Sequence, residues 1–196
     1  DRPVSLVRCP EGQAKQCFFQ RHAGQGLPLP VGELKFGDKT YIFLKNREDI
    51  PTLAQIGVLE LHIWGARADM IDKPDRIVFD LDPGPGVDFV AVRSAAERLR
   101  DLLAAVDLKS FAMLTGGKGI HVVAPIRRSH EWPAVKAFAA AIARRVAQDE
   151  PQHYVATMSK AKRHGRIFID YFRNDKAATA IAPYSTRRYP GAPLAW

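Results

Sequence analysis

The stretch of sequence that decides the fold runs Arg76-Ile77-Val78-Phe79-Asp80-Leu81-Asp82-Pro83-Gly84-Pro85-Gly86. Its first half is apolar and rich in β-branched side chains, which is typical of a strand. The two prolines end that strand because they cannot donate to a ladder. Side chains two residues apart on a strand share a face, so Asp80 and Asp82 point the same way, roughly 7 Å apart at Cα. We therefore expect a strand that ends in two neighbouring carboxylates.

The rest of the chain predicts an α+β fold. Residues 1–35 are rich in Gly, Pro and Gln, and we expect loops with short strands there. Periodicity predicts two long helices, the first capped by Asp88 and continuing to Val106, the second at 135–146. We expect one catalytic domain over residues 1–196, a palm-like mixed or antiparallel sheet covered on one face by helices. Further strands are predicted at 40–44, 58–64, 111–114, 120–124 and 167–171, and a short helix at 50–56.

A third acid strengthens the interest of the Asp80–Asp82 pair. Asp170 lies in another apolar strand and, placed beside the first, would complete a cage of three carboxylates. Like charges so close repel unless a cation lies between them, and Mg²⁺ or Mn²⁺ prefers such hard oxygen ligands. Two metals about 4 Å apart could clamp the attacking and leaving oxygens of a phosphoryl transfer. The plainer alternatives are solvated surface aspartates at a strand end, and an Asp170 paired with a neighbouring arginine.

A glycine-rich hairpin forms the second constellation, Thr115-Gly116-Gly117-Lys118-Gly119-Ile120-His121. It offers backbone N–H groups, a hydroxyl, an ammonium and an imidazole, a set that suits a triphosphate. It is not a Walker A loop, because no Ser or Thr follows the Gly-Lys pair and the preceding spacing differs. A plain turn is the alternative that the residues leave open.

Composition points to a polyanionic partner. The net charge is +8 and the pI about 9.7. Charge runs are usually solvated faces, but the cluster of Lys160, Lys162, Arg163, His164 and Arg166 comes just before Asp170. The spacing of Cys9 and Cys17 fits no zinc pattern, and we expect two free thiols in a reducing cytoplasm. No apolar run of 18 residues and no signal peptide are present, so we expect a cytoplasmic protein, and the start at Asp1 suggests a domain excised from a longer one.

Taken in order, these pieces resemble the polymerase domain of bacterial ligase D, a member of the archaeo-eukaryotic primase superfamily. The resemblance implies a primase/RRM-like palm that adds ribo- or deoxynucleotides to DNA 3′ ends in non-homologous end joining, with two divalent cations. It implies a fused ligase domain and an end-binding Ku-type partner. The resemblance covers nearly the whole chain and rests on five stretches: Leu61-His62-Ile63-Trp64, Val78 to Gly84, Thr115 to His121, Phe168-Ile169-Asp170-Tyr171 and Ala182-Pro183-Tyr184-Ser185.

The resemblance also implies roles for single residues. Asp80, Asp82 and Asp170 match the catalytic metal ligands. Phe18 and Phe19 match an aromatic pair that packs against DNA near the template base, and we expect Lys160 and Lys162 to contact DNA as well. The positions that match the handling of the incoming nucleotide are His62, Thr115, Gly117, Lys118, His121, Arg163 and Arg187.

Two departures and two rival functions accompany the resemblance. The family often has Ser at the places of Thr115 and Gly117, so only Thr115 keeps a hydroxyl. The family also carries an N-terminal helical segment whose lysines grip a downstream 5′-phosphate, and the chain begins after the place of that segment. One rival is a phosphatase of the haloacid dehalogenase type, whose first Asp is a nucleophile, but Pro83 is unusual there. The other is a non-catalytic DNA-end binding module, for which a carboxylate cage facing phosphates has no use.

Overall fold

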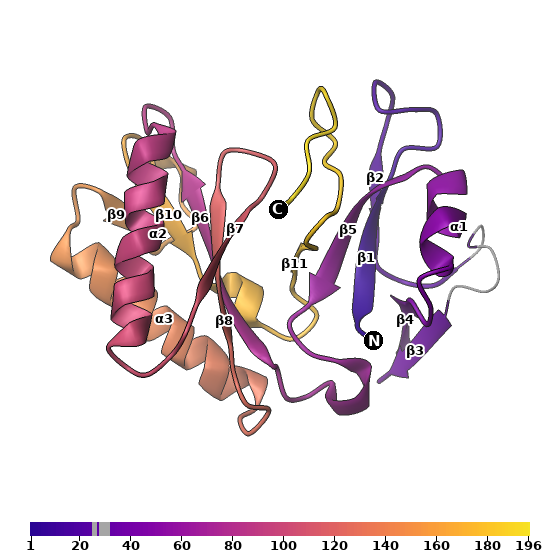
Figure 1. Ribbon diagram of the computed structural model, residues 1–196, viewed down its shortest axis with the longest axis horizontal. Coiled ribbons are helices and arrows are strands. Elements are labelled where there is room, and N and C mark those ends of the chain that lie inside the picture. The colour runs from indigo at the N-terminus through magenta and orange to yellow at the C-terminus, as the bar shows by residue number, and fades with distance from the viewer. Residues whose placement is uncertain (25–26, 28–31) are drawn as a thin grey trace.

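The computed structural model describes residues 1–24, 27 and 32–196, which form two β-sheets and three α-helices (Figure 1). The elements follow in the order β1 (Pro3–Arg8), β2 (Phe18–Gln20), β3 (Gly32–Phe36), β4 (Lys39–Phe43), α1 (Asp49–Gln55), β5 (Val58–Trp64), η1 (Ala68–Met70), β6 (Arg76–Pro83), α2 (Phe89–Ala104), β7 (Phe111–Leu114), β8 (Ile120–Pro125), α3 (Trp132–Asp149), β9 (Tyr154–Val155), η2 (Lys160–Lys162), β10 (Ile167–Asp170), η3 (Phe172–Asn174) and β11 (Thr179–Ile181).

The quoted stretch forms β6, the central strand of a five-stranded sheet ordered β7-β8-β6-β10-β9. Ile77, Phe79 and Leu81 are buried in one apolar core with residues of α2 and α3, which cover the same face of the sheet (Figure 1). The β6 side chains between them, Asp80 among them, therefore point to the opposite face. The sheet is mixed, since β9 and β10 run parallel. This confirms the predicted α+β fold with a mixed sheet covered by helices.

In the described part of residues 1–35 the predicted loops and short strands are present, but the sequence did not predict the second sheet that is built around β1. This six-stranded sheet has the order β11-β5-β1-β4-β3, with β2 also paired to β1. Val4 and Leu6 of β1 are buried and pack with Leu53 of α1. The partners of β1 lie up to about 60 positions away in sequence, as the pairing of Val4 with Ile63 shows. Local composition carries no signal for such long-range pairing.

The prediction of two free thiols was wrong, because Cys9 and Cys17 form a disulfide. The reason lies in the register of the β1–β2 hairpin. Arg8 pairs with Phe18, so the next residue of one strand and the preceding residue of the other face each other directly beyond the last pair. The two Cα atoms are 4.3 Å apart. The bond closes the loop that leads to the aromatic pair Phe18-Phe19.

The long helices follow the sequence pattern closely. The Asp88 carboxylate accepts a hydrogen bond of 2.8 Å from the backbone N–H of Ala91, as expected of an N-cap. The helix ends at Ala104, so Val106 lies beyond it and is half exposed rather than part of the apolar stripe. Of the helices in the described part of the chain, none combines the length and apolar character that a membrane span requires.

Candidate active site

Three carboxylates gather on the face of the five-stranded sheet that the helices leave uncovered. Asp80 of β6 lies directly opposite His121 of β8 on one side and Asp170 of β10 on the other. Residues directly opposite in antiparallel strands present their side chains on the same face. Asp82 follows on that face two residues after Asp80. The structure thus brings Asp170 beside Asp80, which lies 90 positions earlier in the sequence, and beside Asp82.

Two arginines form ion pairs with these carboxylates. The Arg173 guanidinium bridges two of them, with Nη2 3.3 Å from Asp80 Oδ2 and 3.0 Å from Asp170 Oδ2. The Arg163 Nη1 lies 2.9 Å from Asp82 Oδ2, and its guanidinium packs over the Phe168 ring. Both contacts are charge-assisted, which makes them strong for hydrogen bonds. The plain alternative of an aspartate paired with an arginine therefore describes the geometry of Asp170 in this state.

The acids differ in their pKa values. Burial alone would raise the pKa of Asp80, but the His121 imidazole and the Arg173 guanidinium hold it below its usual value. Burial and the nearby negative charge of Asp80 raise the pKa of Asp82. Burial also raises the pKa of Asp170, and Asp80 adds to the effect while Arg173 opposes it. The crowding of negative charge is thus only partly compensated by the arginines.

The donor set suits a hard divalent cation, because three carboxylates on adjacent strands supply only oxygen ligands. Within residues 1–24, 27 and 32–196, however, no three carboxylate, imidazole or thiolate groups converge closely enough to hold one ion. Asp82 is turned toward Arg163, while Asp80 and Asp170 are turned toward Arg173. One oxygen of each carboxylate is thus already in contact with an arginine, and a bound cation would share or replace these contacts.

The glycine-rich hairpin between β7 and β8 lies beside the carboxylates. The Thr115 hydroxyl donates a 2.9 Å hydrogen bond to the carbonyl of Gly119, which closes the turn. Gly116 has φ +68°, and a Cβ there would lie 2.8 Å from both Arg187 Cγ and the Leu194 carbonyl oxygen, so only glycine fits. The Lys118 side chain is exposed at the tip of the loop. The hairpin is therefore shaped by contacts with the C-terminal segment, residues 182–196, as well as by its own sequence.

A cavity of about 500 Å³ joins this hairpin to the acids. The size and the mixture of backbone amides and cations around it are those of a site for an anionic ligand such as a triphosphate. Half of the residues singled out in the sequence line it, while Asp170, His62 and Arg163 do not. The lining residues are Asp80, Asp82, Thr115, Gly117, Lys118, His121 and Arg187, together with Gly116, Gly119, Arg173 and Tyr189.

His62 comes from the other sheet and reaches the site through its neighbours. Its Nε2 lies 2.8 Å from Glu60 Oε2 on the same strand, β5. Its ring meets the Phe19 ring edge-on at 5.1 Å between centroids. Phe18 and Phe19, each nearly half exposed, line a second cavity of about 500 Å³ together with Cys17, Glu60 and Tyr189. Tyr189 lines both cavities, which are therefore adjacent.

The predicted basic cluster divides in two. Lys160 and Lys162 lie in η2 and are exposed to solvent. Arg163, the next residue, is instead turned inward to Asp82 and to the carbonyl of Met158. The cluster therefore supplies both exposed positive charge and a direct partner for one of the three acids.

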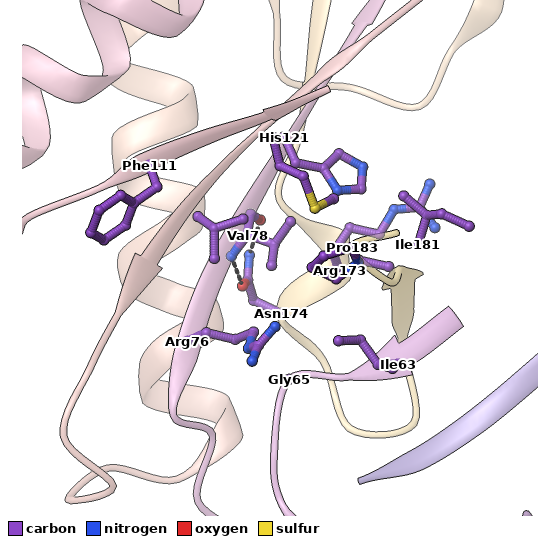
Figure 2. Close-up of a pocket in the computed structure, with 13 residues that line it drawn as sticks. Ile63, Gly65, Arg76, Val78, Phe111, His121, Arg173, Asn174, Ile181 and Pro183 are labelled. Carbon is purple, nitrogen blue, oxygen red and sulfur yellow. Dashed lines mark hydrogen bonds between the residues drawn. The ribbon is translucent and has the colours of Figure 1, made fainter. Parts of the chain in front are cut away.

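A smaller cavity of about 210 Å³ is lined by residues of both sheets (Figure 2). Its lining is mostly apolar, with Val78 from one sheet and Ile63 and Ile181 from the other. His121 and Arg173 line both this cavity and the one that holds the acids. The two polar side chains therefore form the boundary between an apolar interior and the polar site.

The predictions from sequence missed three residues of the site. Arg173 contacts two of the acids, and its only signal is a position three residues after Asp170. Glu60 shares a strand face with His62, a relation that the alternation at 58–64 could have revealed. Tyr189 stands under the Arg187 guanidinium, 5.1 Å from the ring centroid, and no local pattern marks it.

Comparisons with known proteins show similarity over the whole chain. One solved structure, the polymerase domain from Mycobacterium tuberculosis ligase D in complex with DNA, superposes with a TM-score of 0.89 at 29% identity, over 100% of the chain and 73% of that structure. The multifunctional non-homologous end joining protein LigD of Pseudomonas aeruginosa is 36% identical over 99% of the chain and 24% of its own length. The protein of the same name from Mycolicibacterium smegmatis is 35% identical over 95% of the chain and 25% of its own length.

The chain thus spans about a quarter of the length of these two relatives. The family model described as LigD, primase-polymerase domain, matches residues 1–196, the whole chain. Three kinds of similarity, to a family, to individual proteins and to a solved structure, therefore agree with the resemblance drawn from five short stretches. The chain belongs to the LigD primase-polymerase domain family.

Proposed function

We propose that the chain is a nucleotidyltransferase that adds ribo- or deoxynucleotides to DNA 3′ ends, directed by a template strand, in non-homologous end joining. The observation that carries this proposal is the single cavity lined by two of the acids, Asp80 and Asp82, by the glycine-rich hairpin and by Arg187. Carboxylates beside a cationic, amide-rich loop are what a metal-assisted triphosphate reaction needs. Family membership and the names of the relatives support the same activity.

In this proposal the three acids hold two divalent cations, Mn²⁺ or Mg²⁺. When bound, the cations supply the positive charge that lowers the pKa of the primer 3′-hydroxyl and balances the departing pyrophosphate. The turn amides, Lys118 and Arg187 bind the triphosphate oxygens. His121 donates to the same group from β8. Phosphoryl transfer of this kind requires no protein nucleophile, so positioning and charge do the catalysis.

DNA would approach from the side of the aromatic pair. Phe18 and Phe19 expose ring surface on which a base can stack, and Lys160 and Lys162 expose positive charge. The net charge of +8 supports binding to phosphates. The relative from Mycobacterium tuberculosis was solved with DNA bound. A fused ligase domain and an end-binding Ku-type protein are the partners that we propose for the longer protein, which would act in the cytoplasm.

The experiment that tests the proposal is primer extension on a recessed DNA end with Mn²⁺ and each nucleotide. We expect the wild type to extend the primer and Asp82→Ala to lose extension while staying folded. Asp101→Ala, an exposed aspartate of α2 remote from the site, is the matched control and should extend normally. Full extension by Asp82→Ala at saturating Mn²⁺ would refute the metal assignment.

The same experiment separates the rivals. A wild-type chain that binds DNA ends but adds no nucleotide would indicate the non-catalytic binding module. A covalent aspartyl-phosphate, trapped after incubation with a phosphate ester, would indicate the phosphatase instead.

A further inference from the structure

Glu60 is a buried acid beside the proposed nucleotide site. It lies in the middle of β5, and the residue is only 6% exposed. A carboxylate so far removed from water costs free energy unless several donors compensate it. The donors that compensate the carboxylate therefore indicate the role of Glu60.

Three donors surround the carboxylate. Oε2 accepts a 2.8 Å hydrogen bond from the Nε2 of His62. Oε1 accepts hydrogen bonds from the backbone N–H of Arg188 at 2.7 Å and from the Nε of Arg187 at 3.3 Å. These bonds, together with the arginine and imidazole charges, lower the pKa of Glu60 to about 2 even though burial alone would raise it. The group is therefore ionised at neutral pH.

The contacts continue beyond Glu60 to other parts of the site. The Nη1 of Arg187 donates a 2.7 Å hydrogen bond to the carbonyl of Thr115, at the start of the glycine-rich hairpin. The His62 ring in turn meets the Phe19 ring. One carboxylate thus connects segments near residues 19, 62, 115 and 187, which belong to both sheets and to the C-terminal segment.

The bonds also determine which atoms face a ligand. With Nε2 of His62 directed to Glu60, the imidazole can offer only Nδ1 to a ligand. With Nε of Arg187 on Glu60 and Nη1 on Thr115, the guanidinium offers Nη2. The rotation of both side chains is restricted before any ligand arrives, and such preorganisation improves binding because it lowers the cost of ordering.

We propose that Glu60 is a positioning residue that orients His62 and Arg187 toward the incoming nucleoside triphosphate. This inference rests on the proposed function for the identity of the ligand. Glu60 itself does not touch the nucleotide, and it acts through its two partners.

Glu60→Gln tests the proposal, because glutamine keeps the size of the side chain and removes its charge. Its amide group would also present a donor to His62 Nε2 in one orientation. Asp75→Asn is the matched control, since Asp75 is likewise a shielded carboxylate that binds arginines, Arg2 and Arg67, but lies outside the cavities at the site. Both variants should lose stability, so a change in melting temperature alone distinguishes nothing.

The decisive measurement is equilibrium binding of a fluorescent ATP analogue with Mn²⁺, read by fluorescence. We expect Glu60→Gln to weaken binding about 10-fold or more, because a small misorientation at a charged site has effects of that size. Asp75→Asn should bind the analogue as the wild type does, and Glu60→Asp, which keeps the charge, should recover part of the loss. In a chain that already carries His62→Ala and Arg187→Ala, Glu60→Gln should cause no further loss.

The outcomes separate this inference from the proposed function. Wild-type affinity in a folded Glu60→Gln variant, or an equal loss in Asp75→Asn, would overturn the positioning role. So would a full additional loss in the His62→Ala, Arg187→Ala background. A wild type that binds the analogue but extends no primer would contradict the proposed function while leaving the Glu60 comparison valid. A wild type that binds no triphosphate would overturn both.

Discussion

The variant Lys118→Ala provides the most direct test of whether the chain is a polymerase or a DNA-binding module. Lys118 is exposed at the tip of the glycine-rich hairpin and lines the same cavity as Asp80 and Asp82. Because the side chain is exposed, its removal should change the free energy of unfolding by no more than about 0.5 kcal/mol. Any large change in function therefore reflects a lost contact with a ligand.

The expected magnitude follows from the kind of contact. A charge-assisted hydrogen bond to a phosphate oxygen contributes about 1.5–3 kcal/mol. Lys118→Ala should therefore lower kcat/KM for the nucleotide about 10- to 100-fold, with a higher KM and a lower kcat. Affinity for duplex DNA should stay almost unchanged.

Steady-state primer extension over a nucleotide titration gives the kinetic constants, and fluorescence anisotropy of a labelled duplex gives the DNA affinity. Lys109→Ala is the control: the same substitution at an exposed lysine just before β7, at the opposite end of the hairpin. Normal nucleotide kinetics in Lys118→Ala together with weakened DNA binding would show that the triphosphate lies elsewhere.

Three further results are expected. DNA affinity should fall with salt with a log–log slope of about −3 to −4, if about 4 phosphates are neutralised by the net +8 charge, and a slope near zero would contradict the polyanion reading. Reduction of the Cys9–Cys17 disulfide, which closes a loop with a sequence separation of 8, should lower the free energy of unfolding by about 2–3 kcal/mol, and alkylation of the unreduced protein should label neither thiol. Because the pKa of Glu60 falls from 4.5 unfolded to about 2 folded, its stabilising effect is complete above pH 4.5 and is lost as the pH falls toward 2; denaturant titrations should show an acid loss about 2–3 kcal/mol smaller in Glu60→Gln.

The parts of the fold that the sequence predicted are those with strong local patterns. The strand that contains Asp80 begins with a run of buried apolar residues and ends in two acids, and α2 has both an apolar stripe and an N-cap. Short strands were expected in this part of the chain, but the pairing of β1 escaped prediction because its partners are supplied by β2, β4 and β5. The disulfide escaped for a related reason, since the spacing of the two cysteines becomes meaningful only once the register of the hairpin is known.

The sequence predicted which types of residue form the candidate site, but it did not predict which arginines pair with the acids. Acids, glycines and a lysine at characteristic spacings can be recognised in a sequence, because their chemistry depends on identity and local geometry. The partners of the acids cannot, because a long arginine side chain reaches groups that the chain order does not bring near. Arg163 contacts an acid 81 positions away. Thr115 is a second example. Its hydroxyl, which the sequence predicted to contact the nucleotide, donates a hydrogen bond to the Gly119 carbonyl and closes the turn.

The C-terminal segment holds the two halves of the site in their relative positions. Each sheet has its own apolar core, and a third, small cluster joins Met113 of β7, Ile181 of β11 and Ala195. The backbone of Trp196 exchanges two hydrogen bonds with that of Leu114, while residues 182 and 185 bond to β5. The same segment supplies Arg187, which links Glu60 to the glycine-rich hairpin. The acids stand on one sheet and His62 on the other, so the distance between them depends on this short segment more than on either core.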